Sequence, residues 1–196
     1  MLFNYSSGLK DTFIRQGSYL PGQIAKTGWK QAPALNTLAT EPNIEFGQAV
    51  KRAVNDNNLP YATAIASGDA ATDLYGIAVR DVVSQSTVAY GANGTSFVYS
   101  FANGQPVTIL RKGWIAIPVQ NGTPTIGGTV YMRVTASETN ANLPIGGFET
   151  AADDGKCVAI PATFESVALF PMNGVSTAPT DSVATSQTAV IYLDLD

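Results

Sequence analysis

The chain has 196 residues, of which 13% are charged, and its formal net charge is −4. It contains no histidine and a single cysteine, Cys157, which excludes Ser-His-Asp and Cys-His catalysis, the usual zinc sites and an intrachain disulfide. Sparse, net negative charge gives no electrostatic basis for wrapping DNA or RNA, so we expect no nucleic-acid partner.

Residues 1–40 are predicted to form an extended N-terminal arm, because their aromatic side chains are scattered and follow no sustained hydrophobic period. An arm of this kind cannot bury its aromatics alone, so it either packs across its own domain or reaches onto a neighbouring subunit. The residues that we expect to make these contacts are Phe3, Tyr5, Phe13, Tyr19 and Trp29.

The arm also lacks the charged start and unbroken apolar stretch of a secretory signal. No window of the chain approaches the roughly 20 consecutive apolar residues of a membrane helix. We therefore expect mature sequence that is made in a cytoplasm and has no membrane partner.

The stretch from Ile44 to Val54 allows two interpretations. Its apolar residues recur as on one face of a helix, at Ala49, Val50, Ala53 and Val54. The pattern is short, however, and Gly47 and an Asn-Asp-Asn-Asn run from residue 55 bound it. We favour a strand.

Residues 41–196 are predicted to form one β-rich domain whose strands are separated by tight turns. Asn-Gly and similar pairs mark the turns, because such residues tolerate positive φ. The first residue of each pair, always followed by Gly, is Asn93, Asn103, Asn121, Gly127, Gly146, Asp154 or Asn173.

The segments between these turns are rich in Val, Ile, Thr, Tyr and Phe. The clearest predicted strands are 96–101, 106–110, 114–119, 129–134, 156–160 and 189–193. A polar turn is expected at 111–113 and a long loop near 173–187. The pattern predicts an all-β fold, either a β-sandwich or jelly-roll-like domain or a small barrel, with the extended N-terminal arm in front of it.

Carboxylate pairs remain as candidates for glycoside hydrolysis or calcium binding, and they are Asp69 with Asp73, Asp153 with Asp154, and Asp194 with Asp196. We favour a plainer interpretation for each, as turn, loop or chain-end residues. Cys157 lies in an apolar run typical of a small buried hydrophobe, and Trp114 is interpreted as a core or interface residue rather than a sugar-stacking platform. No catalytic, cofactor-binding or metal-binding residue is predicted.

A series of short segments recurs in a recognisable order along the chain. In sequence letters these are PGQIA at 21–25, IEFGQAV at 44–50, YGIA at 75–78, GQPVTILRKG at 104–113 leading into Trp114, GTVYMR at 128–133, and ATFES at 162–166. The series resembles the structural cement proteins of tailed-phage heads, which are small decoration proteins bound to capsids. The segments 84–100 and 173–187, and the arm before residue 21, are longer than that family leads us to expect.

The resemblance implies a protein of the virion surface that is not an enzyme. Its expected partners are the major capsid protein, whose neighbouring subunits it would clamp on the outer face of the assembled head, and itself, as a symmetric dimer or trimer. Two other hypotheses are another virion or surface β-module, such as a tail or carbohydrate-binding domain, and an enzyme without a recognised signature.

Overall fold

The computed structural model describes residues 22–25, 30–36, 44–80, 87–90, 97–101, 104–137, 143–165, 170–171 and 187–195, and the regular structure among them is nearly all β. One short 3-10 helix, η1 (Ala71–Asp73), precedes β5. The strands are β1 (Lys30–Asn36), β2 (Ile44–Glu45), β3 (Ala49–Val54), β4 (Pro60–Ala64), β5 (Leu74–Ala78), β6 (Thr87–Tyr90), β7 (Phe97–Phe101), β8 (Pro106–Asn121), β9 (Thr129–Arg133), β10 (Phe148–Glu149), β11 (Cys157–Phe164), β12 (Phe170–Pro171) and β13 (Gln187–Asp194). The predicted all-β class is confirmed.

Five of these strands close into a small barrel, one of the architectures that the sequence predicts. β8 pairs with β10, β10 with β9, β9 with β11, β11 with β13, and β13 pairs back with β8. Alternate residues of the strands fill the interior, as a pleated strand with one buried face requires. Those contributed by β8 and β13 are Ile115, Ile117, Val119, Ala189, Ile191 and Leu193.

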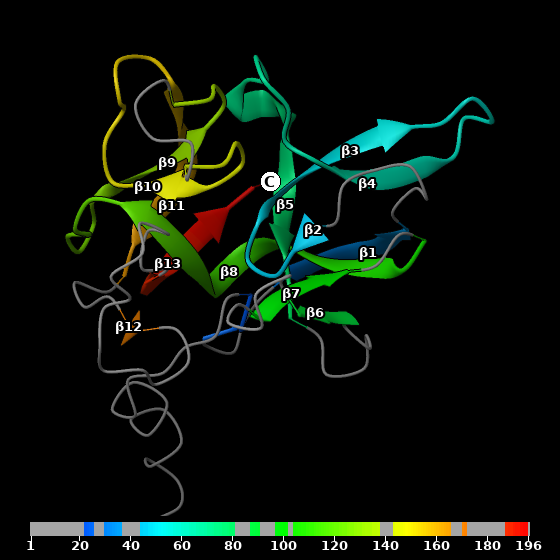
Figure 1. Cartoon of the computed structure of the whole chain (residues 1–196), viewed down its shortest axis with the longest axis horizontal. Coiled ribbons are helices and arrows are strands. Elements are labelled where there is room, and N and C mark those ends of the chain that lie inside the picture. The colour runs from blue at the N-terminus through cyan, green and yellow to red at the C-terminus, as the bar shows by residue number, and fades with distance from the viewer. Residues whose placement is uncertain are drawn as a thin grey trace, which may run out of the picture.

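A second part of the fold is attached to the first half of β8 (Figure 1). There β8 pairs with β1 and β5, β5 pairs with β3, and β3 forms a hairpin with β4. A separate buried cluster that includes Phe46, Phe101 and Ile109 lies here, and the small β2-β7-β6 sheet supplies Phe101 to it. Figure 1 shows the β3–β4 hairpin projecting away from the strands β9, β10 and β11.

The predicted turn at residues 111–113 is wrong, because β8 runs without interruption for 16 residues. Lys112 and Gly113 pair with Asp194 and Leu193 of β13, so backbone pairing carries the chain straight through the polar stretch. Gly113 adopts a φ of 131° at the position where β8 passes from one set of partners to the other. The polar side chains therefore mark a change of partners and not a reversal of direction.

The other predicted strands are confirmed, with one refinement. Strands cover most of 96–101, 129–134, 156–160 and 189–193. The stretch 44–54 is extended, as favoured, but a turn at Phe46 and Gly47 divides it into β2 and β3. The turns predicted at Asn93 and Asn173, and the loop at 173–187 except its last residue, lie outside the described residues.

Part of the predicted arm packs across its own domain. Gly22 donates to the carbonyl of Ala116, Ala116 donates to Gln23, and Ala25 donates to Trp114, so residues 22–25 lie along β8. The Gly22 carbonyl accepts a further bond from the backbone of Arg80. Residues 30–36 form β1, and residues 1–21 lie outside the described residues.

The backbone at Gly22 lies so close to neighbouring backbone atoms that no side chain would fit there. Its φ is +75°, and a Cβ atom there would lie 2.8 Å from the Ala78 oxygen and 2.9 Å from the Gly47 nitrogen. We expect Gly22→Ala to lower the free energy of unfolding by roughly 3 kcal/mol, measured by urea denaturation. Gly68 is the matched control, since its φ is +86° in open space, and Gly68→Ala should cost only about 1 kcal/mol. Equal losses in the two variants would contradict the close packing of residue 22.

Candidate functional site: a buried arginine cluster and an exposed hairpin

The most concentrated group of described ionisable side chains surrounds Arg133, at the end of β9. Its guanidinium is fully buried and donates from Nε to Oε1 of Glu149 and from Nη2 to Oδ2 of Asp153, each at 2.5 Å. Gln120 and Asn121 donate from their side-chain amides to the two Glu149 oxygens, at 3.0 and 3.3 Å. Strands β8, β9 and β10 and the turn at 153 are thereby tied together at one end of the barrel.

The cluster compensates for the cost of burying charge. Burial by itself would lower the pKa of Arg133, but the hydrogen bonds and negative charge of Glu149 and Asp153 outweigh it and raise that pKa. A buried ion pair of this kind holds its geometry while both partners are present, and it becomes costly when one is removed.

A metal site or a reactive thiol does not fit this cluster. One ligand atom from each of Glu149, Asp153 and Cys157 lies within 4.8 Å of the others, but both carboxylates already accept hydrogen bonds from the Arg133 guanidinium. Burial, reinforced by the charge of Glu149, raises the pKa of the Cys157 thiol to about 12, so the thiol stays protonated at neutral pH. The contacts of Arg133 with Glu149 and Asp153 therefore have a structural role, and we refer to them as the Arg133 lock. Cys157 is buried, as predicted.

The candidate carboxylate pairs are also occupied by structural contacts. Asp153 and Asp154 form the predicted turn, with φ values of 43° and 48°. Asp69 accepts hydrogen bonds from Lys51 Nζ at 2.6 Å and from the Ala66 backbone at 2.8 Å. The Asp73 carboxylate accepts from the backbone of Ala70.

Asp194, from the remaining candidate pair, and Trp114 lie near the end of β13. Asp194 pairs with Lys112, whereas Asp196 lies outside the described residues. Trp114 is half-buried against the Tyr192 ring, with centroids 4.8 Å apart, and packs with a small cluster that includes Ala25. This is the packing role that the sequence favours.

The predicted contact residues Phe3, Tyr5, Phe13, Tyr19 and Trp29 all lie outside the described residues, and their role stays a prediction.

The sequence gives little sign of the Arg133 cluster. A lone Arg in an otherwise apolar predicted strand is a signal that a carboxylate must be buried beside it.

The β3–β4 hairpin presents the apolar side chains Val54 and Leu59 to solvent, at 58% and 59% exposure. The Asn55 side chain fixes the tip, because its Oδ1 accepts from the backbone of Asn57 at 3.0 Å and of Leu59 at 2.9 Å. A tip ordered in advance loses little conformational freedom on binding. The Asn-Asp-Asn-Asn run, interpreted from sequence only as a boundary, is this hairpin tip.

Comparisons with known proteins point to one family. The model of the family described as structural cement protein (E217 gp24/Pam3 gp6) matches residues 11–192. No curated protein sequence matches the chain. A chain from a solved structure of the capsid of Myoviridae phage XM1 is similar in fold, with a TM-score of 0.57, 14% sequence identity and 91% of each chain covered. No helix among the described residues is long and apolar enough to cross a membrane.

The buried cluster predicts a large loss of stability in one variant. Glu149→Gln leaves the buried Arg133 guanidinium with one carboxylate, so the free energy of unfolding should fall by about 3 kcal/mol in urea denaturation. The control is Asp194→Asn, which removes a partly exposed ion pair and should cost less than about 1 kcal/mol. Similar losses in both variants would contradict the structural role of the cluster.

The Lys51–Asp69 pair predicts that the free energy of unfolding depends on pH in the acid range. Burial would raise the pKa of Asp69, but the bonds from Lys51 and Ala66 outweigh it and lower that pKa from 3.8. The ionised Asp69 carboxylate therefore contributes to the stability of the fold at pH values above 3.8, its ordinary pKa. This contribution is lost as the pH falls through the lower pKa of Asp69 in the folded protein. Urea denaturation across acid pH should show a shallower decline for Asp69→Asn than for the unmodified chain. If the free energy of unfolding declined equally with falling pH in both proteins, the Lys51–Asp69 pair would not be a cause of the acid dependence.

Proposed function

Because the chain belongs to the structural cement protein family, we propose that it binds the outer surface of the assembled phage head and clamps neighbouring major capsid subunits. The coarser conclusion, a capsid-associated structural role, follows from that membership and agrees with the fold shared with a chain of a phage capsid. The proposal adds where the protein binds and what it holds together.

The observation that carries the proposal is the division of the described chain into a rigid body and contact elements. The closed barrel and its Arg133 lock hold a fixed geometry. The β3–β4 hairpin offers exposed apolar side chains to other chains. Weak contacts made by one rigid body to several subunits gain strength through effective concentration, so a clamp of this kind requires no chemistry.

The same proposal covers the partners and the site of action. The chain acts on the virion surface, without enzymatic activity, nucleic acid or membrane, and associates with itself as a symmetric oligomer. The described carboxylates support this view, because those near one another are engaged in ion pairs, backbone bonds or turns. No particular observation favours a tail or carbohydrate-binding module, since Trp114 is packed against Tyr192.

The position of residues 22–25 generates a prediction about the arm. These residues are hydrogen-bonded along β8, so the chain is fixed to the barrel at Gly22. Deleting residues 1–20 should leave the barrel folded and weaken binding to purified expanded capsids by about tenfold or more, because aromatic anchors carry much of the binding free energy. Co-sedimentation over a concentration series measures the change.

A length-matched variant separates aromatic contacts from mere chain length. Replacing Phe3, Tyr5, Phe13, Tyr19 and Trp29 by Ser should reproduce most of the loss. Equal co-sedimentation of the full and truncated chains would exclude the arm as a clamp. Failure of the unmodified chain to sediment with capsids would overturn the proposed function itself.

A further inference from the structure

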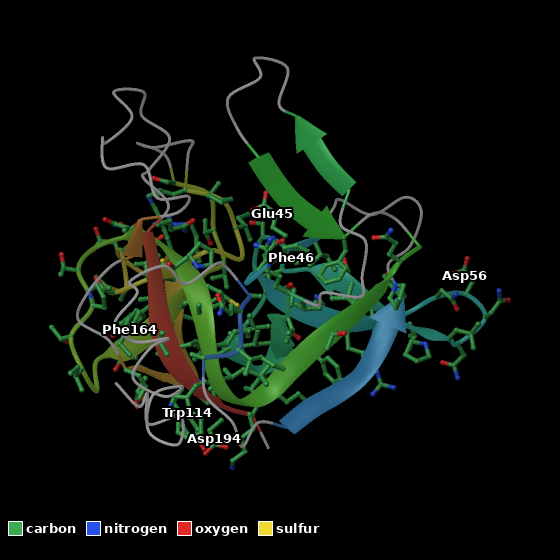
Figure 2. The ribbon with its side chains drawn as sticks, turned by 90° about the horizontal axis from the view of Figure 1, so that it is seen from below. Glu45, Phe46, Asp56, Trp114, Phe164 and Asp194 are labelled. Carbon is green, nitrogen blue, oxygen red and sulfur yellow. The ribbon has the colours of Figure 1, made fainter. Side chains whose placement is uncertain are left out.

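A row of exposed side chains runs along β3 towards the hairpin tip, and it consists of Arg52, Val54 and Asp56. Lys51, which precedes the row, and Ala53 and Asn55, which lie between its members, are half-buried, so exposure alternates along residues 51–56 as expected for an extended chain. Asp56 lies at the far end of the projecting hairpin (Figure 2). The row therefore presents a cation, an apolar side chain and an anion in line.

The cationic end of the row is positioned by its surroundings. The Arg52 guanidinium lies 5.9 Å from the centre of the Tyr75 ring, and the Arg111 guanidinium lies 4.8 Å from the same ring. Arg111 also donates to the Tyr75 carbonyl. Strands β3, β5 and β8 are adjacent in the sheet, so two positive charges are held beside one aromatic side chain.

These charges have no ion-pair partner within the described part of the chain. Lys51, Lys112 and Arg133 each contact a carboxylate there, whereas Arg52 and Arg111 do not. Asp56, at the other end of the row, likewise forms no ion pair among the described residues. Two neighbouring guanidinium groups without a counter-charge attract a carboxylate from outside the chain.

The order of the row makes it complementary to itself. Val54 lies midway between Arg52 and Asp56, so a two-fold axis passing beside Val54 would place each Arg52 opposite Asp56 of the second copy. The two Val54 side chains would then meet at the axis. The same operation brings Arg111, which lies with Arg52 beside the Tyr75 ring, towards that carboxylate.

We propose that this face of the β3–β4 hairpin is the surface through which two copies of the chain associate, with Arg52 of each copy paired with Asp56 of the other. The inference rests on the proposed self-association and adds its surface, its symmetry and its charge pairs. The occupant is a second copy because this chain itself carries the matching carboxylate at the tip of a projecting, internally hydrogen-bonded hairpin.

Sedimentation velocity of the full chain over a dilution series tests the proposal. The unmodified chain should form a reversible dimer. Arg52→Glu or Asp56→Arg alone should weaken dimerisation by about tenfold or more, and combining the two changes should restore it to within about threefold, because the charge pair is rebuilt in reverse. Circular dichroism should show an unchanged fold, since both side chains are exposed.

A neutral pair of variants provides the matched control. Asp56→Asn should weaken the dimer, whereas Asp154→Asn should not. Asp154 is an exposed acid in the turn before β11, and its φ of 48° is one that Asn tolerates. Equal effects of the two changes would mean that net charge, and not this contact, governs association, and would overturn the proposal.

The outcomes separate the proposed surface from the proposed function. A monomeric unmodified chain overturns both the surface and self-association, whereas dimers that persist unchanged in the single-reversal variants overturn the surface alone. A double variant that stays weak contradicts the pairing of Arg52 with Asp56. Single-reversal variants that dimerise normally but no longer co-sediment with capsids assign this face to a capsid subunit and overturn the proposal.

Discussion

β8 connects the two halves of the described fold, because different parts of one strand pair with different partners. Its first half pairs with β1 and β5, and its second half pairs with β13, while β10 joins near its end. Residues 22–25 add a further line of hydrogen bonds around Trp114 and Ala116. The barrel interior and the hairpin sheet therefore share one backbone, and a displacement of β8 would alter the position of both.

This connection matters for a protein whose proposed work is mechanical. The barrel is closed by backbone pairing and locked at one end by the buried contacts of Arg133 with Glu149 and Asp153. The β3–β4 hairpin projects from this body, and residues 22–25 are fixed along it by hydrogen bonds to β8. A rigid centre holds its contact elements at fixed separations, which is the condition under which several weak contacts reinforce one another. Clamping in this account depends on geometry and on apolar and ionic contacts.

Local sequence patterns predicted most of the strands and turns, because apolar alternation and Gly-containing pairs act over a few residues. Pairing between distant segments was beyond their reach. The polar residues Arg111 and Lys112 indicated a turn, but their backbones are held in a continuous strand by β1 and β13. Closure of the barrel depends on β13 meeting β8, which no local pattern specifies.

The features of the candidate site were likewise only partly predictable from the sequence. The absence of histidine and the burial of Cys157 were evident from the sequence, and the resemblance to cement proteins came from the order of short segments along the chain. A lone Arg133 in an apolar strand hinted at a buried partner, but its partners were not predictable, because Glu149 and Asp153 lie 16 and 20 residues away and meet Arg133 only in the folded barrel. The row of Arg52, Val54 and Asp56 needed the observed exposure of the hairpin.

A cryo-EM reconstruction of expanded capsids incubated with the full chain tests the clamp most directly. The account predicts density for the barrel on the outer surface of the head, in contact with at least two major capsid subunits. Density confined to a single subunit or to the tail, or capsids without added density under saturating protein, would contradict it.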